Sequence, residues 1–490
     1  MKKCFLMLLV VLLALSNLFL YSQAPDTMWT RMFKATGGMF SGMAISKFAK
    51  QTPDGGFIGI GYSVHPFLMA HIIKTDAIGN KLWQKEYFDN YNKGTLTVSS
   101  AAQISDNNYI IAGYGNILQD KGLFLIKIDS NGDTLWTQFY NHQDSIVITK
   151  EIKISSDKGF ILTGTIAPLI NADQANVFFM KTDEYGNMQW SDRFGLENIF
   201  DDGYSVEESY DGNYLIAGKT GMPSSEDTIF VIKVGTNGSL IDIKIFGDEP
   251  DIKYPSENIN LFKTSDRNYM LAGHDGGDIH LIKLDQNLKI LWHKVWGSEN
   301  IETANNIIET RDGGFIAVGK INLEWPPNSG NGKYFPLIVK FNSSGEFVWD
   351  KIMYNEFDGD FHSINQNSDG GFIVGGQQKD NQAFDHFYMV RLLGDGNYVN
   401  DMNSSDFHLE ISPNPVSNDL KIGYNLTKTD KIKISIVDFF GRELMLLKNS
   451  INIAGSHYIQ TDVSNLLSGI YYFVLKNDEK TIIQKFIVVK

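Results

Sequence analysis

The sequence predicts an all-β fold, a seven-bladed β-propeller closed by an N-terminal strand and followed by a C-terminal β-sandwich. Three observations lead to this prediction. One motif occurs seven times, its copies show no convincing 3.6-residue period, and the last copy lacks a strand that stands alone near the N-terminus. The 490 residues, 43% of them hydrophobic, suffice for more than one domain with its own core.

The repeated motif begins with an Asp, which an aromatic residue follows after three positions and a Gly after seven. The Asp residues are Asp54, Asp106, Asp157, Asp211, Asp266, Asp312 and Asp369. The period of 46 to 57 residues is in the range of propeller blades and solenoids. Each Asp is followed by Gly, Asn or other turn residues, so we interpret it as the backbone acceptor of a tight hairpin rather than as a catalytic or calcium-binding carboxylate.

Each copy then contains an apolar run that ends in a basic residue, and in five copies a Trp follows nine positions later. The basic residues are Lys74, Lys127, Lys181, Lys233, Lys283, Lys340 and Arg391, and the tryptophans are Trp83, Trp136, Trp190, Trp292 and Trp349. We expect each basic head group to lie near the Asp two residues later, as in Lys74 and Asp76. A basic ring around the propeller mouth is the alternative.

The two ends of the array favour a closed propeller over an open solenoid. Copy seven stops at Asn400 without a Trp and without a fourth strand. Residues 29–33, which begin with Trp29, form a lone strand-like segment ahead of the first copy. Pairing this segment with the last copy would remove two unpaired sheet edges, so we expect the propeller to span residues 25–400.

The Gly-x-x-x-Trp spacing, seen in Gly79 and Trp83, resembles the tryptophan-docking repeats of quinoprotein-like propellers. That resemblance implies that each Trp packs between neighbouring blades. Copy four has Asp242 at the Trp position, and copy five has Leu288 at the Gly position. We therefore expect two joints between blades to be packed differently.

Residues 1–24 have the pattern of a secretory signal peptide, with two lysines, an apolar run and small residues at the end. We expect cleavage after Ala24, with Gln23 as a close alternative, and no stable transmembrane anchor. Cys4 precedes the apolar run, so a lipid anchor through it is not expected, and the processed chain has no cysteine for disulfides.

Beyond a polar linker at 401–406, residues 407–490 alternate in the manner of strands with one buried face. Four motifs occur in order there, and their main residues are Pro413, Asn414, Pro415, Gly441, Leu466, Gly469, Tyr471, Lys485 and Lys490. This region closely resembles the type A sorting domain of type IX secretion in the Bacteroidota. The resemblance implies a small β-sandwich, recognition by the type IX machinery, and a secreted or outer-surface location reached through the periplasm.

The sequence contains few motifs that point to catalysis or to ligand binding. The formal net charge of −14 argues against a nucleic-acid partner, and nothing in the sequence predicts a cofactor. His274, Asp275, Asp278 and His280 form one local cluster that could face a cation, although a polar turn explains it equally well. A long loop in copy six carries Trp325 and Tyr334, which are typical of a stacking surface for a sugar or peptide, although a loop that only covers the outer face is the simpler interpretation.

We therefore expect a non-catalytic binding or structural module whose propeller offers a glycan or a protein ligand a rigid face. The alternative is a secreted enzyme that degrades polysaccharide or peptide at the channel mouth, for which the sequence assigns no catalytic residue. Converging carboxylates or a His–carboxylate pair in the centre would favour the enzyme, whereas small and apolar inner residues would favour binding.

Overall fold

In the computed structural model the described part of the chain is built of strands, turns and connecting segments, without helices. The structure describes residues 24–34, 44–64, 68–87, 95–104, 107–117, 120–142, 145–169, 174–195, 200–221, 228–246, 254–255, 257–275, 277–324, 332–354, 357–382, 384–394, 407–412, 416–426, 428–438, 442–467, 469–477 and 481–488. The expected signal peptide, apart from Ala24, and the linker 401–406 lie outside these ranges. No helix long and apolar enough to cross a membrane occurs within them.

Seven antiparallel sheets of four strands make up the body, numbered here in chain order. Sheet 1 is β2 (Ala44–Gln51), β3 (Phe57–Val64), β4 (Leu68–Thr75) and β5 (Lys81–Tyr87), and sheet 2 is β6 (Thr95–Gln103), β7 (Tyr109–Ile117), β8 (Asp120–Ile128) and β9 (Thr134–Asn141). Sheet 3 is β10 (Ser145–Ile154), β11 (Phe160–Pro168), β12 (Asn176–Thr182) and β13 (Met188–Phe194), and sheet 4 is β14 (Phe200–Glu208), β15 (Tyr214–Gly221), β16 (Thr228–Val234) and β17 (Leu240–Phe246). Sheet 5 is β18 (Glu257–Lys263), β19 (Tyr269–His274), β20 (Ile279–Leu284) and β21 (Ile290–Trp296), and sheet 6 is β22 (Ile301–Glu309), β23 (Phe315–Glu324), β24 (Gly332–Phe341) and β25 (Phe347–Ile352). Sheet 7 is β26 (Gly359–Gln366), β27 (Phe372–Lys379), β28 (Asp385–Leu392) and β1 (Thr27–Phe33).

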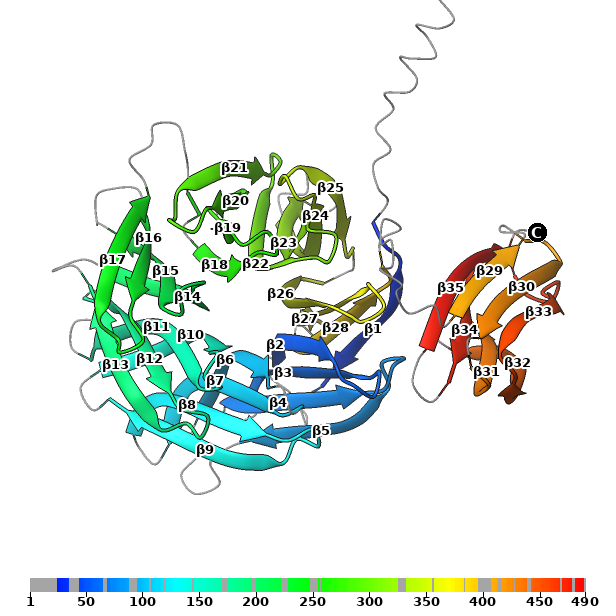
Figure 1. Cartoon of the computed structure of the whole chain (residues 1–490), viewed down its shortest axis with the longest axis horizontal. Coiled ribbons are helices and arrows are strands. Elements are labelled where there is room, and N and C mark those ends of the chain that lie inside the picture. Colours follow the sequence, from blue (N-terminus) through cyan, green and yellow to red (C-terminus); the bar gives the residue numbers. More distant parts are fainter. Residues whose placement is uncertain are drawn as a thin grey trace, which may run out of the picture.

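The sheets follow one another around a common centre, with the first strand of each repeat innermost (Figure 1). Each of these inner strands contacts the inner strand of the next sheet, and β26 contacts β2. The predicted pairing of the N-terminal segment with the last copy is confirmed, because β1 pairs antiparallel with β28 from Thr27 opposite Leu392 to Phe33 opposite Phe387.

In the copies that the structure describes, the repeated Asp makes the hairpin between the first two strands, as predicted; Asp106 lies outside the described residues. In sheet 1 the Thr52 hydroxyl and the Gly56 N–H both donate hydrogen bonds to Asp54 Oδ1, at 2.5 and 3.0 Å. The same pattern occurs at Asp157 with Ser155 and Gly159. A carboxylate that accepts these bonds fixes the turn locally, so the motif recurs for structural reasons.

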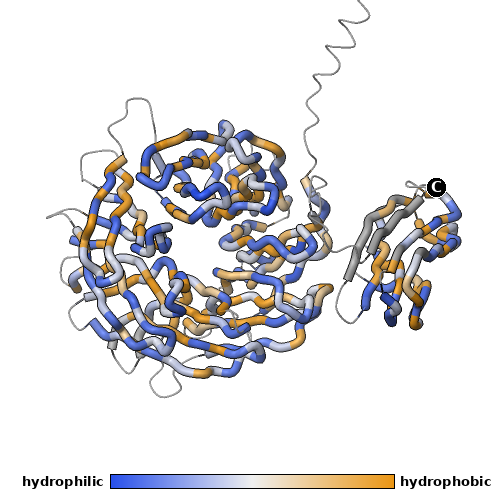
Figure 2. The backbone as a smooth tube through the Cα atoms, viewed as in Figure 1, coloured by the Kyte–Doolittle hydropathy of each residue, from blue (hydrophilic) through white to orange (hydrophobic). Residues whose placement is uncertain are grey.

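The hydrophobic core of the body is divided among the joints between sheets. Hydrophobic and hydrophilic residues are interspersed along every sheet (Figure 2). Among the described residues, seven buried clusters each combine side chains from two consecutive sheets. One of them unites Trp29 and Phe387 of sheet 7 with Phe57 and Ile73 of sheet 1. The last sheet is therefore packed on the first in the same way as the others are packed on one another.

Tryptophan docking between neighbouring sheets is confirmed, and Gly supplies the receiving surface. A Cβ built on Gly79 would lie 2.8 Å from the ring of Trp29, so a side chain there would collide with the indole. The same relation holds between Gly132 and Trp83 and between Gly186 and Trp136. Each of these glycines has a φ near +80°, which suits Gly for the turn as well. The Trp of one sheet therefore lies on the turn of the next.

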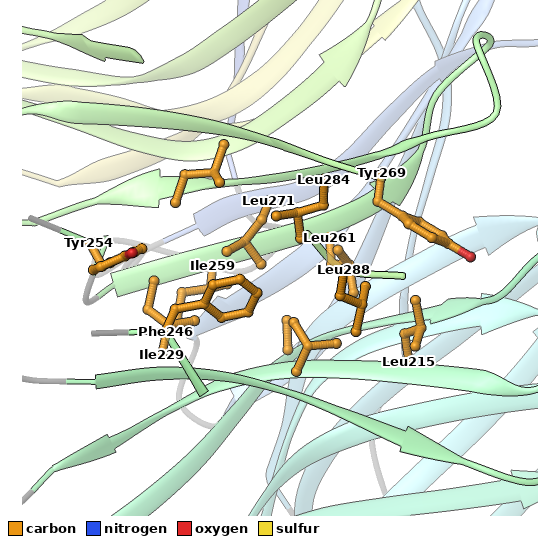
Figure 3. Close-up of a cluster of buried hydrophobic side chains, with 13 residues drawn as sticks. Leu215, Ile229, Phe246, Tyr254, Ile259, Leu261, Tyr269, Leu271, Leu284 and Leu288 are labelled. Carbon is orange, nitrogen blue, oxygen red and sulfur yellow. The ribbon is translucent and has the colours of Figure 1, made fainter. Parts of the chain in front are cut away.

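This rule corrects the expectation of two unusual joints, because both departures lie at the same joint, between sheets 4 and 5. Asp242 replaces the Trp of sheet 4, and Leu288 replaces the Gly of sheet 5 that would have received it. Leu288 adopts a φ of +60° and is buried in a cluster that contains Phe246 and Tyr254 (Figure 3). Aliphatic and aromatic side chains thus occupy the joint that lacks an indole.

The C-terminal region forms two further sheets around one core. One contains β29 (Phe407–Ser412), β30 (Asp419–Leu426) and β33 (Gly455–Asp462), and the other contains β32 (Glu443–Asn452), β31 (Asp430–Val437), β34 (Gly469–Lys476) and β35 (Thr481–Val488). The predicted alternation is confirmed, because Leu420, Ile422, Ile432 and Ile434 are fully buried in a cluster shared by both sheets.

Replacement of Trp29 tests how strongly the N-terminal strand holds the body together. Trp29 is 3% exposed and lies edge-on to Phe57 with ring centroids 5.4 Å apart. We expect Trp29→Ala to lower the free energy of unfolding by about 3 kcal/mol or more in urea titrations, because it leaves a cavity at this joint. Met32→Ala on the same strand, where the side chain is 50% exposed, should change it by about 0.5 kcal/mol at most. Equal effects of the two substitutions would contradict the docking role.

Candidate functional site

All seven inner strands carry a β-bulge at the same place, seven residues before the repeated Asp in six of the sheets. In sheet 5 the irregularity spans Asn258 and Ile259. Ile259 lies seven residues before Asp266 but is buried in the hydrophobic joint with sheet 4, so Asn258, whose side chain reaches Asn305, represents sheet 5 in the set below. A bulge adds one residue to a strand and redirects its side chain. We call these residues the bulge ring: Lys47, Ser99, Lys150, Tyr204, Asn258, Asn305 and His362.

Side chains of the bulge ring contact one another across the joints. Lys47 Nζ lies 3.4 Å from Nδ1 of His362, although the two residues are 315 positions apart. Asn258 donates a hydrogen bond to Oδ1 of Asn305 at 2.8 Å, and the ammonium of Lys150 lies 5.0 Å from the ring centroid of Tyr204. These contacts join ring residues of sheets 7 and 1, of sheets 5 and 6, and of sheets 3 and 4.

The position after the bulge has a structural role. Its side chain accepts a hydrogen bond from a backbone N–H of the next inner strand in four sheets. The acceptor and donor residues are Ser100 and Ile152, Glu151 and Val206, Ser205 and Leu261, and Asn306 and Ile364. Three residues further along, Glu208, Glu309, Gln366 and Gln51 accept from the backbone of the neighbouring hairpin, and the bond from Ser368 to Gln51 joins sheet 7 to sheet 1. Polar residues of different types thus hold neighbouring sheets together at these two positions of the repeat.

Carboxylates near the ring face lysines. Lys153 lies 3.5 Å from Glu151 and 3.4 Å from Glu207, and these charges outweigh the effect of burial and raise the pKa of Lys153. Asp360 lies 3.5 Å from Lys320 and 3.8 Å from Nε2 of His362. Burial raises the pKa of Asp360 to about 6 despite the nearby lysines.

The centre meets one of the two expectations stated for it. It is polar and charged rather than small and apolar, and it contains a His–carboxylate pair, His362 and Asp360, of the kind expected to favour an enzyme. Burial, together with Lys47 and Lys320, holds the pKa of His362 well below its usual value. The distance of 3.8 Å between Nε2 of His362 and Asp360 is longer than a hydrogen bond.

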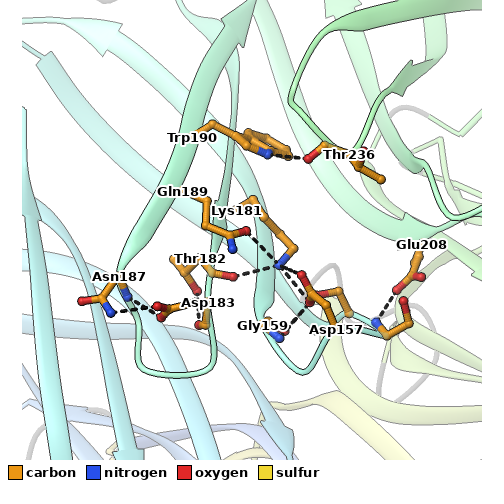
Figure 4. A network of polar contacts seen from close by, with 12 residues as sticks. Asp157, Gly159, Lys181, Thr182, Asp183, Asn187, Gln189, Trp190, Glu208 and Thr236 are labelled. Atoms are coloured by element: carbon orange, nitrogen blue, oxygen red, sulfur yellow. Dashed lines mark hydrogen bonds and ion pairs between the residues drawn. The ribbon is translucent and has the colours of Figure 1, made fainter.

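The repeated basic residues pair with the hairpin Asp, not with the Asp two positions later, so that predicted partner was wrong. Lys181 Nζ donates to Asp157 Oδ2 at 2.7 Å and to the carbonyl oxygen of Thr182 at 2.8 Å (Figure 4). The equivalent pairs are Lys74 with Asp54, Lys233 with Asp211, Lys283 with Asp266, Lys340 with Asp312 and Arg391 with Asp369. Asp76 instead accepts from the backbone of its own turn. Since most of these basic side chains are buried, they do not form an open basic ring.

The four metal candidates are only partly brought together. His280 Nε2 lies 3.3 Å from Asp275 Oδ2, whereas Oδ1 of Asp275 accepts the N–H groups of Gly277 and Asp278. His274 instead faces Asn258, at 3.3 Å. Within the described ranges no three His, Cys, Asp or Glu side chains are arranged to hold a metal ion. A metal at these residues stays a prediction.

The other predicted site residues fall in two groups. Tyr334 is 37% exposed and its ring lies 4.7 Å from the ammonium of Lys320, whereas Trp325 lies outside the described residues. Of the sorting motifs, Leu466 and Tyr471 pack against the C-terminal core, and the hydroxyl of Tyr471 donates to the carbonyl oxygen of Leu467 at 2.9 Å. Gly469 begins β34, and the backbone of Lys485 pairs in β35. Pro413, Asn414, Pro415, Gly441 and Lys490 lie outside the described residues.

Sequence reasoning missed the bulge ring. The only signal for it is the fixed distance of seven residues to the Asp, which Lys47, Ser99, Lys150, Tyr204, Asn305 and His362 all share. Because these residues have no chemical property in common, a search for a repeated residue type passes over them.

Residues 410–489 match the family described as the secretion system C-terminal sorting domain. This domain marks the chain as a protein that type IX secretion exports to the cell surface or releases. Comparison with curated proteins gives no match.

Among solved structures, the chain is similar to PorZ, a surface component of the type IX secretion system of Porphyromonas gingivalis, at 14% identity and a TM-score of 0.35, with 93% of this chain and 53% of that one covered. The chain therefore spans about half the length of PorZ. A puromycin hydrolase has 9% identity and a TM-score of 0.44, with 79% and 59% covered. Drosophila Plexin A in complex with Semaphorin 1b has 8% identity and a TM-score of 0.39, with 76% and 88% covered.

The pair of Lys181 and Asp157 should respond asymmetrically to substitution, because the Lys181 side chain is 1% exposed and that of Asp157 is 51% exposed. Asp157→Asn leaves a buried ammonium without its counter-charge, so we expect a loss of at least about 2 kcal/mol of unfolding free energy. Lys181→Met leaves a carboxylate that water can solvate, so its loss should stay below about 1 kcal/mol. Chemical denaturation of both variants measures the difference, and the reverse order would contradict the assignment.

Proposed function

We propose that residues 25–400 form a closed seven-bladed propeller, that 401–406 are a linker, and that 407–490 are a β-sandwich sorting domain, with residues 1–24 removed as a signal peptide. The pairing of β1 with β28 and the hydrogen bond from Ser368 to Gln51 support closure. The match of residues 410–489 to the sorting family supports the C-terminal boundary.

We propose further that the exported propeller is a non-catalytic binding module, with its ligand at the bulge ring. One observation carries this proposal. The hairpin Asp, the aromatic residue and the Gly recur in all seven copies, whereas the bulge position has a hydroxyl, an amide, an imidazole, a phenol or an ammonium. A position that the fold leaves free to vary, within a rigid frame, suits recognition.

Replacing a bulge-ring residue with the residue found at the same position of another sheet tests the site without disturbing the fold. Ser99 occupies the same bulge position as Tyr204, so Tyr204→Ser introduces a residue that the bulge accommodates elsewhere in the protein. We expect ligands identified on glycan and peptide arrays with residues 25–490 to bind this variant at least about tenfold more weakly. Tyr185→Ser is the matched control, because Tyr185 lies in an outer turn and is 63% exposed. Equal affinity of both variants and the native chain would argue against the ring.

The second candidate function is a secreted enzyme that degrades polysaccharide or peptide. It is favoured by Asp360, a carboxyl group with a pKa of about 6 that lies 3.8 Å from His362. Such an acid would act in its protonated form, so activity would fall as the pH rises through 6 and would be lost in Asp360→Asn.

We expect no turnover of the array ligands between pH 4 and 8, because the lysine Lys320 and the amide of Asn305 already occupy the carboxylate oxygens of Asp360. Reducing-sugar and amine-release assays measure this directly. Turnover with the stated pH profile, absent in Asp360→Asn, would replace the binding proposal with the enzyme.

A further inference from the structure

Lys47 is a partly buried cation that forms no ion pair with the described carboxylates. It lies on β2 at the bulge, and its nearest polar contact is Nδ1 of His362 at 3.4 Å. Among the described residues no carboxylate oxygen lies within 4 Å of its ammonium. Burial, with Lys150 adding to it, lowers the pKa of Lys47 to about 8 even though Asp360 acts in the opposite direction. At neutral pH this group carries a charge that the protein itself does not neutralise.

The neighbouring charges are already matched. Lys150 lies 3.6 Å from Asp202, and Lys320 lies 3.5 Å from Asp360. Three lysines therefore share two carboxylates in this part of the ring, and one positive charge is left over. A ligand with a single negative charge would complete the balance, whereas Asp202 and Asp360 would repel a dianion such as a phosphate monoester.

The other residues of the bulge ring indicate which class of ligand carries the negative charge. Ser99, Asn258 and Asn305 supply a hydroxyl and two amides, which both donate and accept hydrogen bonds, and Tyr204 supplies an aromatic ring. Hydroxyl-rich ligands use such groups, with the aromatic face against the sugar ring. The ring residues offer no aliphatic surface for an apolar peptide side chain.

We propose that the bulge ring binds an acidic carbohydrate, with the monoanionic substituent of one sugar, a carboxylate or a sulfate ester, placed at Lys47. This inference rests on the proposed binding function and adds its ligand class. Lys47 is then a specificity-determining residue that selects acidic over neutral sugars.

Calorimetry on residues 25–490 with four probes tests the proposal: tetragalacturonate, its neutral methyl ester, a sulfated galactose oligosaccharide and a polyglutamate peptide. We expect tetragalacturonate or the sulfated oligosaccharide to bind, and the one that binds identifies the anionic group. The methyl ester should bind at least tenfold more weakly than tetragalacturonate if the carboxylate is recognised. Lys47→Met should lose at least tenfold in affinity while its melting temperature stays equal or rises, since it removes a partly buried charge that has no ion-pair partner. Lys85→Met, at an ion-paired lysine on the outer strand β5, should leave both unchanged.

The outcomes separate the two proposals. Undiminished affinity in Lys47→Met, or binding of polyglutamate alone, would overturn the acidic-carbohydrate inference. If the neutral methyl ester binds as tightly as tetragalacturonate and this binding is lost in Tyr204→Ser, the acidic-carbohydrate inference is overturned but the proposed binding function is retained. Binding that is unaffected by Lys47→Met and by Tyr204→Ser would overturn both, because the ligand would then lie elsewhere.

Discussion

The contact between an indole and a glycine turn of the following sheet is the constraint on which the body of this protein depends. The Trp of one sheet packs on the turn of the next, so each repeat is stabilised by its neighbour. Trp29 extends this dependence to the two ends of the array, where it lies on Gly79. Because Cys4 is the one cysteine of the sequence, no disulfide forms within the chain, and stability comes from these joints and their hydrophobic clusters.

Two kinds of polar residue must be distinguished at the centre of the body. Residues such as Ser205 and Gln51 hold neighbouring inner strands together by accepting backbone hydrogen bonds. Their polarity is a requirement of the fold, because a buried N–H without an acceptor is destabilising. Lys47 sits one residue earlier in its repeat, and its ammonium contacts the side chain of His362 rather than a backbone group. A polar lining by itself therefore does not identify a site, because the fold requires part of it.

The sequence predicted most of the fold because its strongest signals are local. The hairpin Asp and the turn Gly follow from backbone chemistry within a few residues, and the missing last strand follows from comparing the two ends of the array; the structure agrees with all three. The partner of Lys74 was predicted wrongly because Asp76 is only two residues away, whereas Asp54 is brought to the ammonium by the strand register. The bulge ring was invisible because a register shift has no residue signature of its own.

The joint between sheets 4 and 5 also shows that its two departures from the repeat depend on each other. At the other joints a Cβ on the turn glycine would lie within about 3 Å of atoms of the docked indole, so a leucine at this turn and a docked tryptophan exclude one another. With Asp242 at the tryptophan position, Leu288 instead fills the joint together with Phe246 and Tyr254. Leu288 keeps the left-handed backbone of the turn, at a φ of +60°, so this joint combines side-chain packing with a backbone conformation that residues other than glycine rarely adopt.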